Sequence, residues 1–208
     1  MSLTRRSLVP LLLAAAPLAL QAQDLPSRFG LGFAFVAPQG DWKDTYDSGW
    51  NVGLHVHFNR EGNHEQRLRI DFIGLKEFKE SGRLMGADYT VKANAAGVGV
   101  GYDWLFHFDG RRSAPGAYAL IGVGGIRWTE EFTAKSEPSA RNPYHVVDSQ
   151  DFTSFALTVG LGVRLSRNIG LEVRHTEART DKIRWFGESE RFVDAGLSNT
   201  SVGITFRF

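Results

Sequence analysis

The chain has 208 residues, of which 42% are apolar, 12% are aromatic and 23 are glycine, a composition that suits one folded β domain and not a disordered chain. Its formal net charge of +1 gives no electrostatic basis for a nucleic-acid partner. Because cysteine is absent, disulfides, thiol catalysis, cysteine–zinc sites and a lipoprotein anchor are excluded. No run of 18 apolar residues follows the N-terminal segment, which excludes a helical membrane protein.

Residues 1–22 are predicted to be a cleavable signal peptide. Arg5 and Arg6 precede the apolar run Leu8–Leu20, which is too short to span a bilayer as a mature helix. Ala22 is the expected last residue of the leader, so the mature domain would be residues 23–208. The paired arginines also fit, less well, a twin-arginine signal. Either route predicts an exported protein.

Eight segments alternate apolar residues with small or polar ones, which is typical of strands with two unlike faces. In the last of them, Val202, Ile204 and Phe206 share one parity, and glycine and polar residues occupy the other. The predicted strands are Arg28–Val36, Trp50–Phe58, Arg67–Leu75, Tyr89–Trp104, Gly116–Trp128, Phe152–Leu165, Ile169–Thr176 and Gly196–Phe208.

The phase of the fifth predicted strand is ambiguous, because large apolar residues occur on both parities. Tyr118, Leu120, Ile126 and Trp128 lie on one, and Ile121 and Val123 lie on the other. A β-bulge midway along the strand would place both groups on one face.

The connections between the predicted strands alternate between long and short. The long ones are Ala37–Ser48, Lys76–Asp88, Thr129–Asp151 and Thr180–Ala195, and the short ones are Asn59–His64, His107–Pro115 and Ser166–Asn168. Even-stranded outer-membrane barrels have long loops outside the cell and tight turns in the periplasm. The pattern therefore predicts an all-β, eight-stranded antiparallel up-and-down transmembrane barrel with its C-terminus at the periplasmic end.

The residues opposite the apolar parity indicate which face is inside. They are mostly glycine, alanine and serine with a few charges, whereas the water-facing strands of a soluble lipocalin-like barrel would carry Lys, Glu and Thr. A narrow eight-stranded lumen requires small residues. We therefore expect the apolar parity to face lipid.

The chain resembles the OmpA/OmpX-type small outer-membrane β-barrel superfamily, the outer membrane protein beta-barrel domain. The resemblance covers the mature chain and is carried by three motifs: Pro38-Gln39-Gly40-Asp41-Trp42, Gly97-Val98-Gly99-Val100-Gly101-Tyr102 and Val202-Gly203-Ile204-Thr205-Phe206-Arg207-Phe208. It implies that the barrel-assembly machinery reads the C-terminal strand ending in Phe208. Unlike OmpA, the chain is expected to lack a periplasmic peptidoglycan-binding domain.

Seven charged residues are expected to face the lumen and to form a connected network that is either a structural plug or a gate: Arg69, Asp71, Asp103, Arg164, Glu172, Arg174 and Arg207. Buried charges are costly unless they are paired. Because arginine outnumbers carboxylate in this set, any leak should favour anions.

Other polar residues give weaker indications of chemistry. His55 and His57 are both predicted to face inward, but two imidazoles do not complete a metal site. His175 and Glu177 could belong to an outward-facing lipid hydrolase, yet the lipid A deacylases of this fold use a His-x-Ser pair, and here no serine follows His175 by two residues. No catalytic residue, cofactor or metal is therefore predicted.

Aromatic residues near the predicted strand ends are expected to form the interfacial girdles of a membrane barrel. They are Trp50, Phe58, Tyr102, Trp104, Tyr118, Trp128 and Phe208.

The expected protein is a non-enzymatic, monomeric outer-membrane barrel with a closed lumen that serves membrane integrity or surface-loop contacts. Its expected partners are outer-membrane lipids and lipopolysaccharide. A narrow channel for small solutes and, less favoured, an outer-membrane lipid hydrolase remain alternatives.

Overall fold

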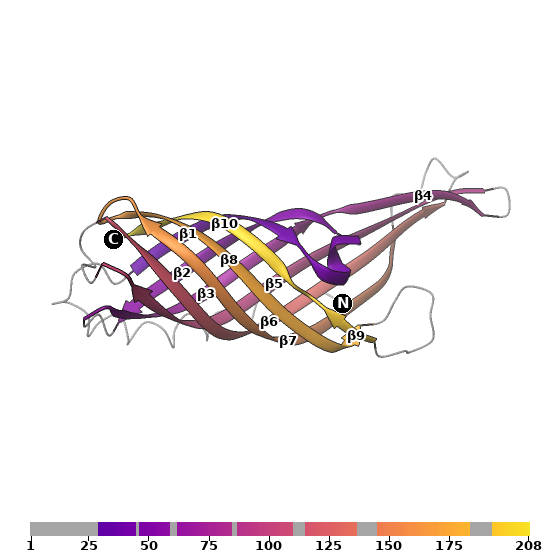
Figure 1. Cartoon of the computed structure of the whole chain (residues 1–208). Helices are drawn as coiled ribbons and strands as arrows, with labels where there is room; N and C mark the ends of the chain where they lie inside the picture. The colour runs from indigo at the N-terminus through magenta and orange to yellow at the C-terminus, as the bar shows by residue number, and fades with distance from the viewer. Residues whose placement is uncertain are drawn as a thin grey trace.

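A computed structural model describes residues 29–44, 46–58, 62–84, 87–109, 115–136, 145–183 and 193–208. The predicted signal peptide lies outside these residues. Within them, ten strands form one antiparallel sheet that closes on itself, because β10 (Asn199–Arg207) pairs with both β1 (Phe29–Pro38) and β8 (Ile169–Ile183) (Figure 1). The remaining elements are η1 (Gly40–Asp44), β2 (Asp47–Phe58), β3 (His64–Lys76), β4 (Phe78–Leu84), β5 (Ala87–His107), β6 (Gly116–Ser136), β7 (His145–Arg164) and β9 (Val193–Gly196).

Eight of these strands form the wall of the barrel, and each pairs with the next wall strand along the chain. The other two are short extensions: β4 follows β3 and pairs with β5, and β9 pairs with β8 just before β10. The predicted eight-stranded up-and-down barrel is therefore confirmed. Closure leaves no unpaired strand edge in the wall, as a barrel in a bilayer requires.

The two ends of the barrel differ in length. The short turns join β2 to β3, β5 to β6 and β7 to β8 at one end, called here the short-turn end. At the opposite, long-hairpin end, β4 and the facing parts of β5 and β6 project well beyond the rest of the wall (Figure 1). The predicted difference between the two ends is therefore seen in the hairpins that project at one end, and not in the lengths of the connections between strands. Among the described residues, no helix is long and apolar enough to cross a membrane.

The predicted boundaries of the long connections are wrong, because strands continue into them. Residues expected in the loop Thr129–Asp151 belong to β6 as far as Ser136 and to β7 from His145, and Lys76–Asp88 contains β4. The sequence criterion was apolar alternation, which stops where the outer face leaves lipid. Ladder hydrogen bonds continue past that level because both strands of each hairpin are still present.

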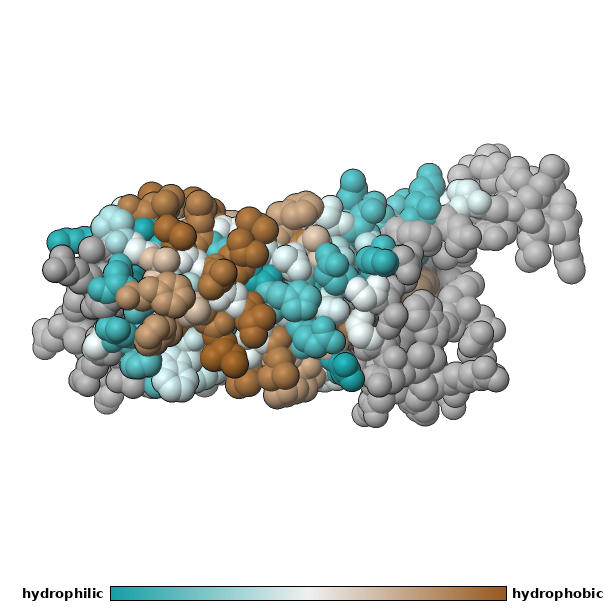
Figure 2. Space-filling view, in the orientation of Figure 1, coloured by the Kyte–Doolittle hydropathy of each residue, from teal (hydrophilic) through white to brown (hydrophobic). Residues whose placement is uncertain are grey.

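The outward faces of the wall strands form an apolar belt, defined here as the outward-facing residues of 29–35, 50–58, 68–72, 98–106, 121–123, 155–165, 169–173 and 202–208. Phe35 and Leu161, for example, are 58% and 62% exposed. Figure 2 shows this brown band between more hydrophilic teal regions toward either end. Val202 also faces outward, as expected if the apolar parity contacts lipid.

The structure resolves the phase of β6 without a bulge midway. Its register with β5 runs unbroken from Tyr89↔Ser136 to His107↔Tyr118, and the irregularity with β7 lies further along, between Phe132 and Thr133. One parity of β6 therefore faces inward from Tyr118 to Glu130, and no bulge brings the two apolar groups to one face. Large apolar side chains occur on both faces of β6 because the lumen itself has apolar layers.

This phase also corrects part of the predicted aromatic girdle. Trp50, Tyr102, Trp104 and Phe208 are exposed on the outer face, whereas Tyr118 and Trp128 are only 2% and 0% exposed and lie inside the barrel. Their inward position follows from strand parity, which a position near a strand end does not reveal.

Candidate functional site: the charged lumen

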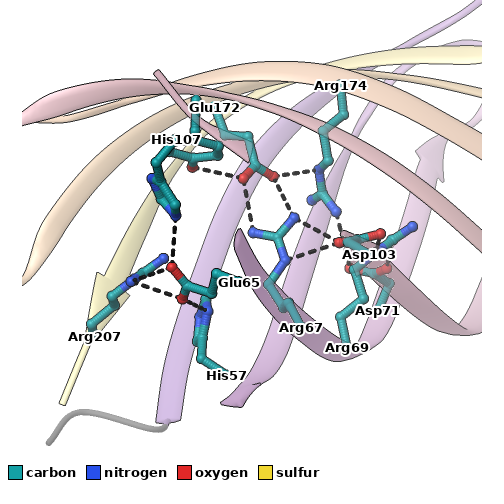
Figure 3. Close-up of polar contacts among 11 residues, drawn as sticks. His57, Glu65, Arg67, Arg69, Asp71, Asp103, His107, Glu172, Arg174 and Arg207 are labelled. Carbon is teal, nitrogen blue, oxygen red and sulfur yellow. Dashed lines mark hydrogen bonds and ion pairs between the residues drawn. The ribbon is translucent and has the colours of Figure 1, made fainter. Parts of the chain in front are cut away.

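The structure places all seven predicted lumen charges on inward faces and buries each of them. They come from β3, β5, β7, β8 and β10, so the network links strands that are far apart in sequence. Figure 3 shows how most of them converge from different strands across the barrel interior. The structure also adds Glu65, Arg67 and His107 to these charged groups, which the predicted set omitted, and it buries Glu130 nearer the long-hairpin end.

Arg67 is the centre of the middle layer of the lumen. Its guanidinium donates to Asp103 Oδ2 at 2.9 and 2.7 Å, and to both carboxylate oxygens of Glu172 at 2.8 and 3.1 Å. The hydroxyl of Tyr118 donates to Glu172 at 2.9 Å. Arg67 thus joins β3 to β5 and, across the lumen, to β8 (Figure 3).

A second pair of arginines extends this layer toward the long-hairpin end. Arg69 forms an ion pair with Asp71, contacts Asp103 at 3.0 Å and donates to the Thr158 hydroxyl at 3.0 Å. Arg174 Nε lies 3.0 Å from Glu172 Oε1, and its NH1 lies 4.0 Å from Asp71. Arg67, Arg69, Asp71, Asp103, Glu172 and Arg174 are together called the central network.

A separate cluster of polar side chains occupies the short-turn end of the lumen. It is built around the Glu65 carboxylate. His57 Nδ1 lies 2.6 Å from Glu65 Oε1, His107 Nε2 lies 2.9 Å from Oε2, and Arg207 NH1 lies 3.0 Å from Oε1. Arg164 contacts the other nitrogen of His107. These five residues, called here the Glu65 cluster, connect β2, β3, β5, β7 and β10.

Sequence reasoning missed residues of both groups for identifiable reasons. Arg67 shares the inward parity of Arg69 and Asp71, although the predicted charged set does not include it. Glu65 and His107 lie just outside the predicted strands Arg67–Leu75 and Tyr89–Trp104. Glu65 shares the parity of Arg67, and His107 that of Asp103. Extending the alternation by one period of two residues before Arg67, and by two periods after Asp103, would therefore have found both.

Glycines on the inward faces make room for these long side chains. A Cβ on Gly122 would lie 2.1 Å from Asp103 Oδ1, and one on Gly162 would lie 2.1 Å from the Tyr118 ring. A Cβ on Gly101 would lie 3.0 Å from the Arg69 guanidinium. The glycine-rich parity is thus the complement of the charged and aromatic side chains on neighbouring strands.

An aromatic plug closes the long-hairpin end of the described lumen. The η1 segment places Trp42 against Trp128, with ring centroids 4.4 Å apart, and Tyr46 packs against Trp42 at 5.4 Å. The Tyr46 hydroxyl donates to Glu130 at 2.9 Å. Trp42, Tyr46 and Trp128 are buried. The first connection therefore folds into the mouth of the barrel (Figure 1).

Between the plug and the central network lies a small internal cavity of about 20 Å³. Arg69, Asp71 and Arg174 line one side of it, and Ile73 and Ile126 line the other. This volume accommodates about one or two water molecules.

The two predicted inward histidines, His55 and His57, are both buried, so their inward orientation is confirmed. Their rings are 6.2 Å apart at the centroids. His57 belongs to the Glu65 cluster, whereas His55 lies next to it along β2. In the described part of the chain, no group of three or more His, Cys, Asp or Glu side chains is arranged to hold a metal ion.

His175 and Glu177 lie on the outer face of β8, where both are exposed. His175 Nε2 is 3.8 Å from Glu177 Oε2, which is too long for a hydrogen bond. His175 Nδ1 is 3.1 Å from the Thr200 hydroxyl on β10. In an acyl-transfer site a carboxylate would hold the histidine base by a hydrogen bond. Glu177 does not hold His175 in this way.

A closed eight-stranded barrel with an apolar outer belt and a charged interior defines a transmembrane β-barrel of the outer-membrane class. Residues 7–208 match the family described as outer membrane protein beta-barrel domain, and the chain belongs to this family. Membership implies a location in the bacterial outer membrane. No curated protein gave a significant match.

Solved structures with the same fold include Ail, the attachment invasion locus protein of Yersinia pestis, in a complex with the heparin analogue sucrose octasulfate. It is 16% identical, with 88% of this chain and 97% of that chain covered and a TM-score of 0.51. The N-terminal barrel of Pseudomonas aeruginosa OprF is 10% identical over 88% and 99% of the two chains, with a TM-score of 0.47. At these identities the likeness concerns the fold alone.

Proposed function

We propose that this protein is a closed-lumen barrel without catalytic activity that supports the integrity of the outer membrane and presents its long hairpins for surface contacts. The observation that carries the proposal is the double barrier in the lumen. The central network and the Glu65 cluster form one barrier, and the aromatic plug forms the other.

The charged barrier stays closed because each buried carboxylate and arginine is paired with groups of opposite charge. Each carboxylate of the central network contacts two or more arginines, so moving one side chain would leave a buried charge without a partner. Such a loss costs about 3–5 kcal/mol. This cost supports a structural plug over a gate in which ion pairs exchange partners. The same contacts tie together strands that do not neighbour one another in the wall, which supports a role in mechanical integrity.

The test is conductance of the full barrel in planar bilayers. We expect no steady current from the wild-type protein, with insertion verified by flotation with lipid vesicles. A variant truncated in the plug, the central network and the Glu65 cluster, namely Trp42→Gly with Trp128→Gly, Arg67→Ser and Glu65→Ser, should conduct and so show that an open barrel is detectable. A stable wild-type current would overturn the proposal and favour the narrow channel.

Any residual current should favour anions slightly. Five arginines and four carboxylates make up the two charged groups of the lumen, namely Arg67, Arg69, Arg164, Arg174 and Arg207 against Glu65, Asp71, Asp103 and Glu172. The excess of one positive charge equals that of the predicted set of seven residues, which holds four arginines and three carboxylates.

The proposal includes two further properties. The protein acts as a monomer, and the barrel-assembly machinery recognises its C-terminal strand through Phe208. Phe208 is exposed, and its backbone N–H donates to the Phe29 carbonyl at 2.9 Å, beside the pairing of β1 with β10. An aromatic end group at the strand that closes the barrel supports a role in assembly.

A further inference from the structure

A groove of about 260 Å³ lies on the outer surface where the apolar belt ends toward the long hairpins. Its lining comes from β2, β3, β5 and β6 and consists of Trp50, Phe72, Ile73, Ala96, Gly97, Val98, Arg127 and Thr129. The groove lies outside the lumen and uses none of the residues of the central network or the Glu65 cluster.

The strand register explains why the surface is hollowed at this place. Across the sheet, Trp50 pairs with Gly74, Gly74 with Ala96 and Ala96 with Thr129. The two small residues Gly74 and Ala96 therefore lie between the bulky Trp50 indole and the polar Thr129. The Trp50 ring leans over Gly74, where a Cβ would lie 2.6 Å from the ring. Phe72 and Val98 form the next row toward the middle of the belt.

The groove combines an apolar surface with one cation at its upper edge. Arg127 follows Ile121 and Val123 as the first outward charge on β6 beyond the belt, and its side chain is 70% exposed. A guanidinium carries five N–H donors. Asp151 takes one of them at 3.1 Å and also accepts a hydrogen bond from Thr129 at 2.7 Å. Donors of Arg127 thus remain available for a planar, bidentate contact with a phosphate.

This geometry matches a lipid at the level where acyl chains meet headgroups. Long hairpins face the outside of the cell in outer-membrane barrels, so the groove would open into the outer leaflet, where lipopolysaccharide resides. Lys76, exposed two residues beyond Gly74 on β3, adds a second cation above the groove. Asp151 is the acidic group in contact with Arg127 and would compete with an anionic ligand.

We propose that the groove binds one acyl chain of lipid A, the lipid part of lipopolysaccharide, while a lipid A phosphate contacts Arg127. This site rests on the outer-membrane location of the protein but not on the closed lumen. A failed conductance test would therefore leave it standing, and loss of lipid A binding would leave the lumen proposal standing.

The experiment titrates lipid A into the purified full chain in detergent micelles and measures retained lipid by native mass spectrometry. We expect one tightly held lipid A per wild-type barrel. Arg127→Gln should weaken its retention about fivefold, the effect of one cation near an anionic lipid surface. Ala96→Phe should abolish retention by filling the groove. Asp151→Asn should strengthen it by releasing Arg127 from its competitor.

Two matched variants serve as controls. Arg179→Gln removes another exposed arginine from the outer face beyond the belt, and Ala119→Phe adds a ring elsewhere on the outer face of β6. Both should retain lipid A as the wild type does. Equal affinity in Arg127→Gln and the wild type would overturn the proposal. Retention of phosphatidylcholine or phosphatidylglycerol as strong as that of lipid A would overturn it as well.

Discussion

At the scale of single residues, Arg67 shows how a buried charge is accommodated in this lumen. Four hydrogen bonds to Asp103 and Glu172 occupy its guanidinium, and both acceptors contact a further arginine. Desolvating these ions is unfavourable by several kcal/mol each, and only mutual pairing offsets it. The stability of the barrel should therefore depend more on keeping each pair complete than on the number of pairs.

We predict that Arg67→Met destabilises the folded barrel by about 3–5 kcal/mol, because it leaves two buried carboxylates undercompensated. Urea unfolding in lipid vesicles measures this change. Arg179→Gln is the control, since Arg179 is exposed on the outer face beyond the belt and should change the free energy of unfolding by at most about 0.5 kcal/mol. If Arg67→Met were as stable as the wild type, the central network would contribute nothing to stability.

At the scale of elements, η1 decides whether the long-hairpin end is open or closed. Gly40 starts the segment with a positive φ of 61°, and a Cβ there would lie 3.1 Å from the Gly196 carbonyl, so the turn into the mouth favours glycine. The Gln39 N–H donates to the Ser198 carbonyl at 2.7 Å and anchors the entry. Trp42 and Tyr46 then bury their rings inside the barrel.

The plug should respond to pH through Glu130, which lies beyond the apolar belt. Burial raises the pKa of the Glu130 carboxyl, while hydrogen bonds from Gln150 and Tyr46 act in the opposite direction. A carboxyl whose pKa is raised by folding stabilises the folded form while it is protonated. Its contribution is complete below the usual pKa of a glutamate and is lost as the pH rises through the raised value.

We therefore predict that the plug is more stable at acidic than at neutral pH in the window just above the usual glutamate pKa. Near-ultraviolet circular dichroism of the Trp42–Trp128 contact reports on the closed plug. In Glu130→Gln, which stays neutral and keeps an acceptor for Tyr46, this transition should disappear. A transition that is unchanged in Glu130→Gln would show that another group controls the plug.

At the scale of the whole molecule, closure of the barrel depends on β10. This strand is last in the chain but pairs with β1 from Gly30↔Arg207 to Pro38↔Asn199 and with β8 on its other side. Pairing between the two ends of a chain is entropically unfavourable until the other strands are in place. A terminal recognition signal is consistent with this late step.

We predict that Phe208→Ser reduces the amount of folded barrel in the outer membrane of expressing cells severalfold but leaves refolding of the purified chain in detergent unchanged. Heat-modifiable migration on gels measures both. Trp104→Ser, which removes another exposed aromatic side chain from the outer face, is the control and should be assembled normally. Equal losses in cells and in detergent would indicate a defect in stability and not in recognition.

Much of this fold could be predicted from local patterns. Alternation with a period of two identified all eight wall strands, placed Val202 and Phe35 outside, and placed Arg69 and Glu172 inside. The same criterion failed for the long hairpins, where the outer face leaves lipid and alternation weakens although the ladder continues. It also left β6 ambiguous, because the lumen contains apolar layers around Leu120 and Trp128.

On the strands with clear alternation the sequence by itself determined which residues face inward, because side-chain direction along a strand is a local property. Only the tertiary structure decided which of them meet. Glu172 contacts Arg67 across 105 positions of sequence, and Arg207 contacts Glu65 across 142. Such contacts depend on the stagger and tilt of strands around the closed barrel, which no single segment encodes. The plug and the outer groove arise in the same way, from residues that only closure and register bring together.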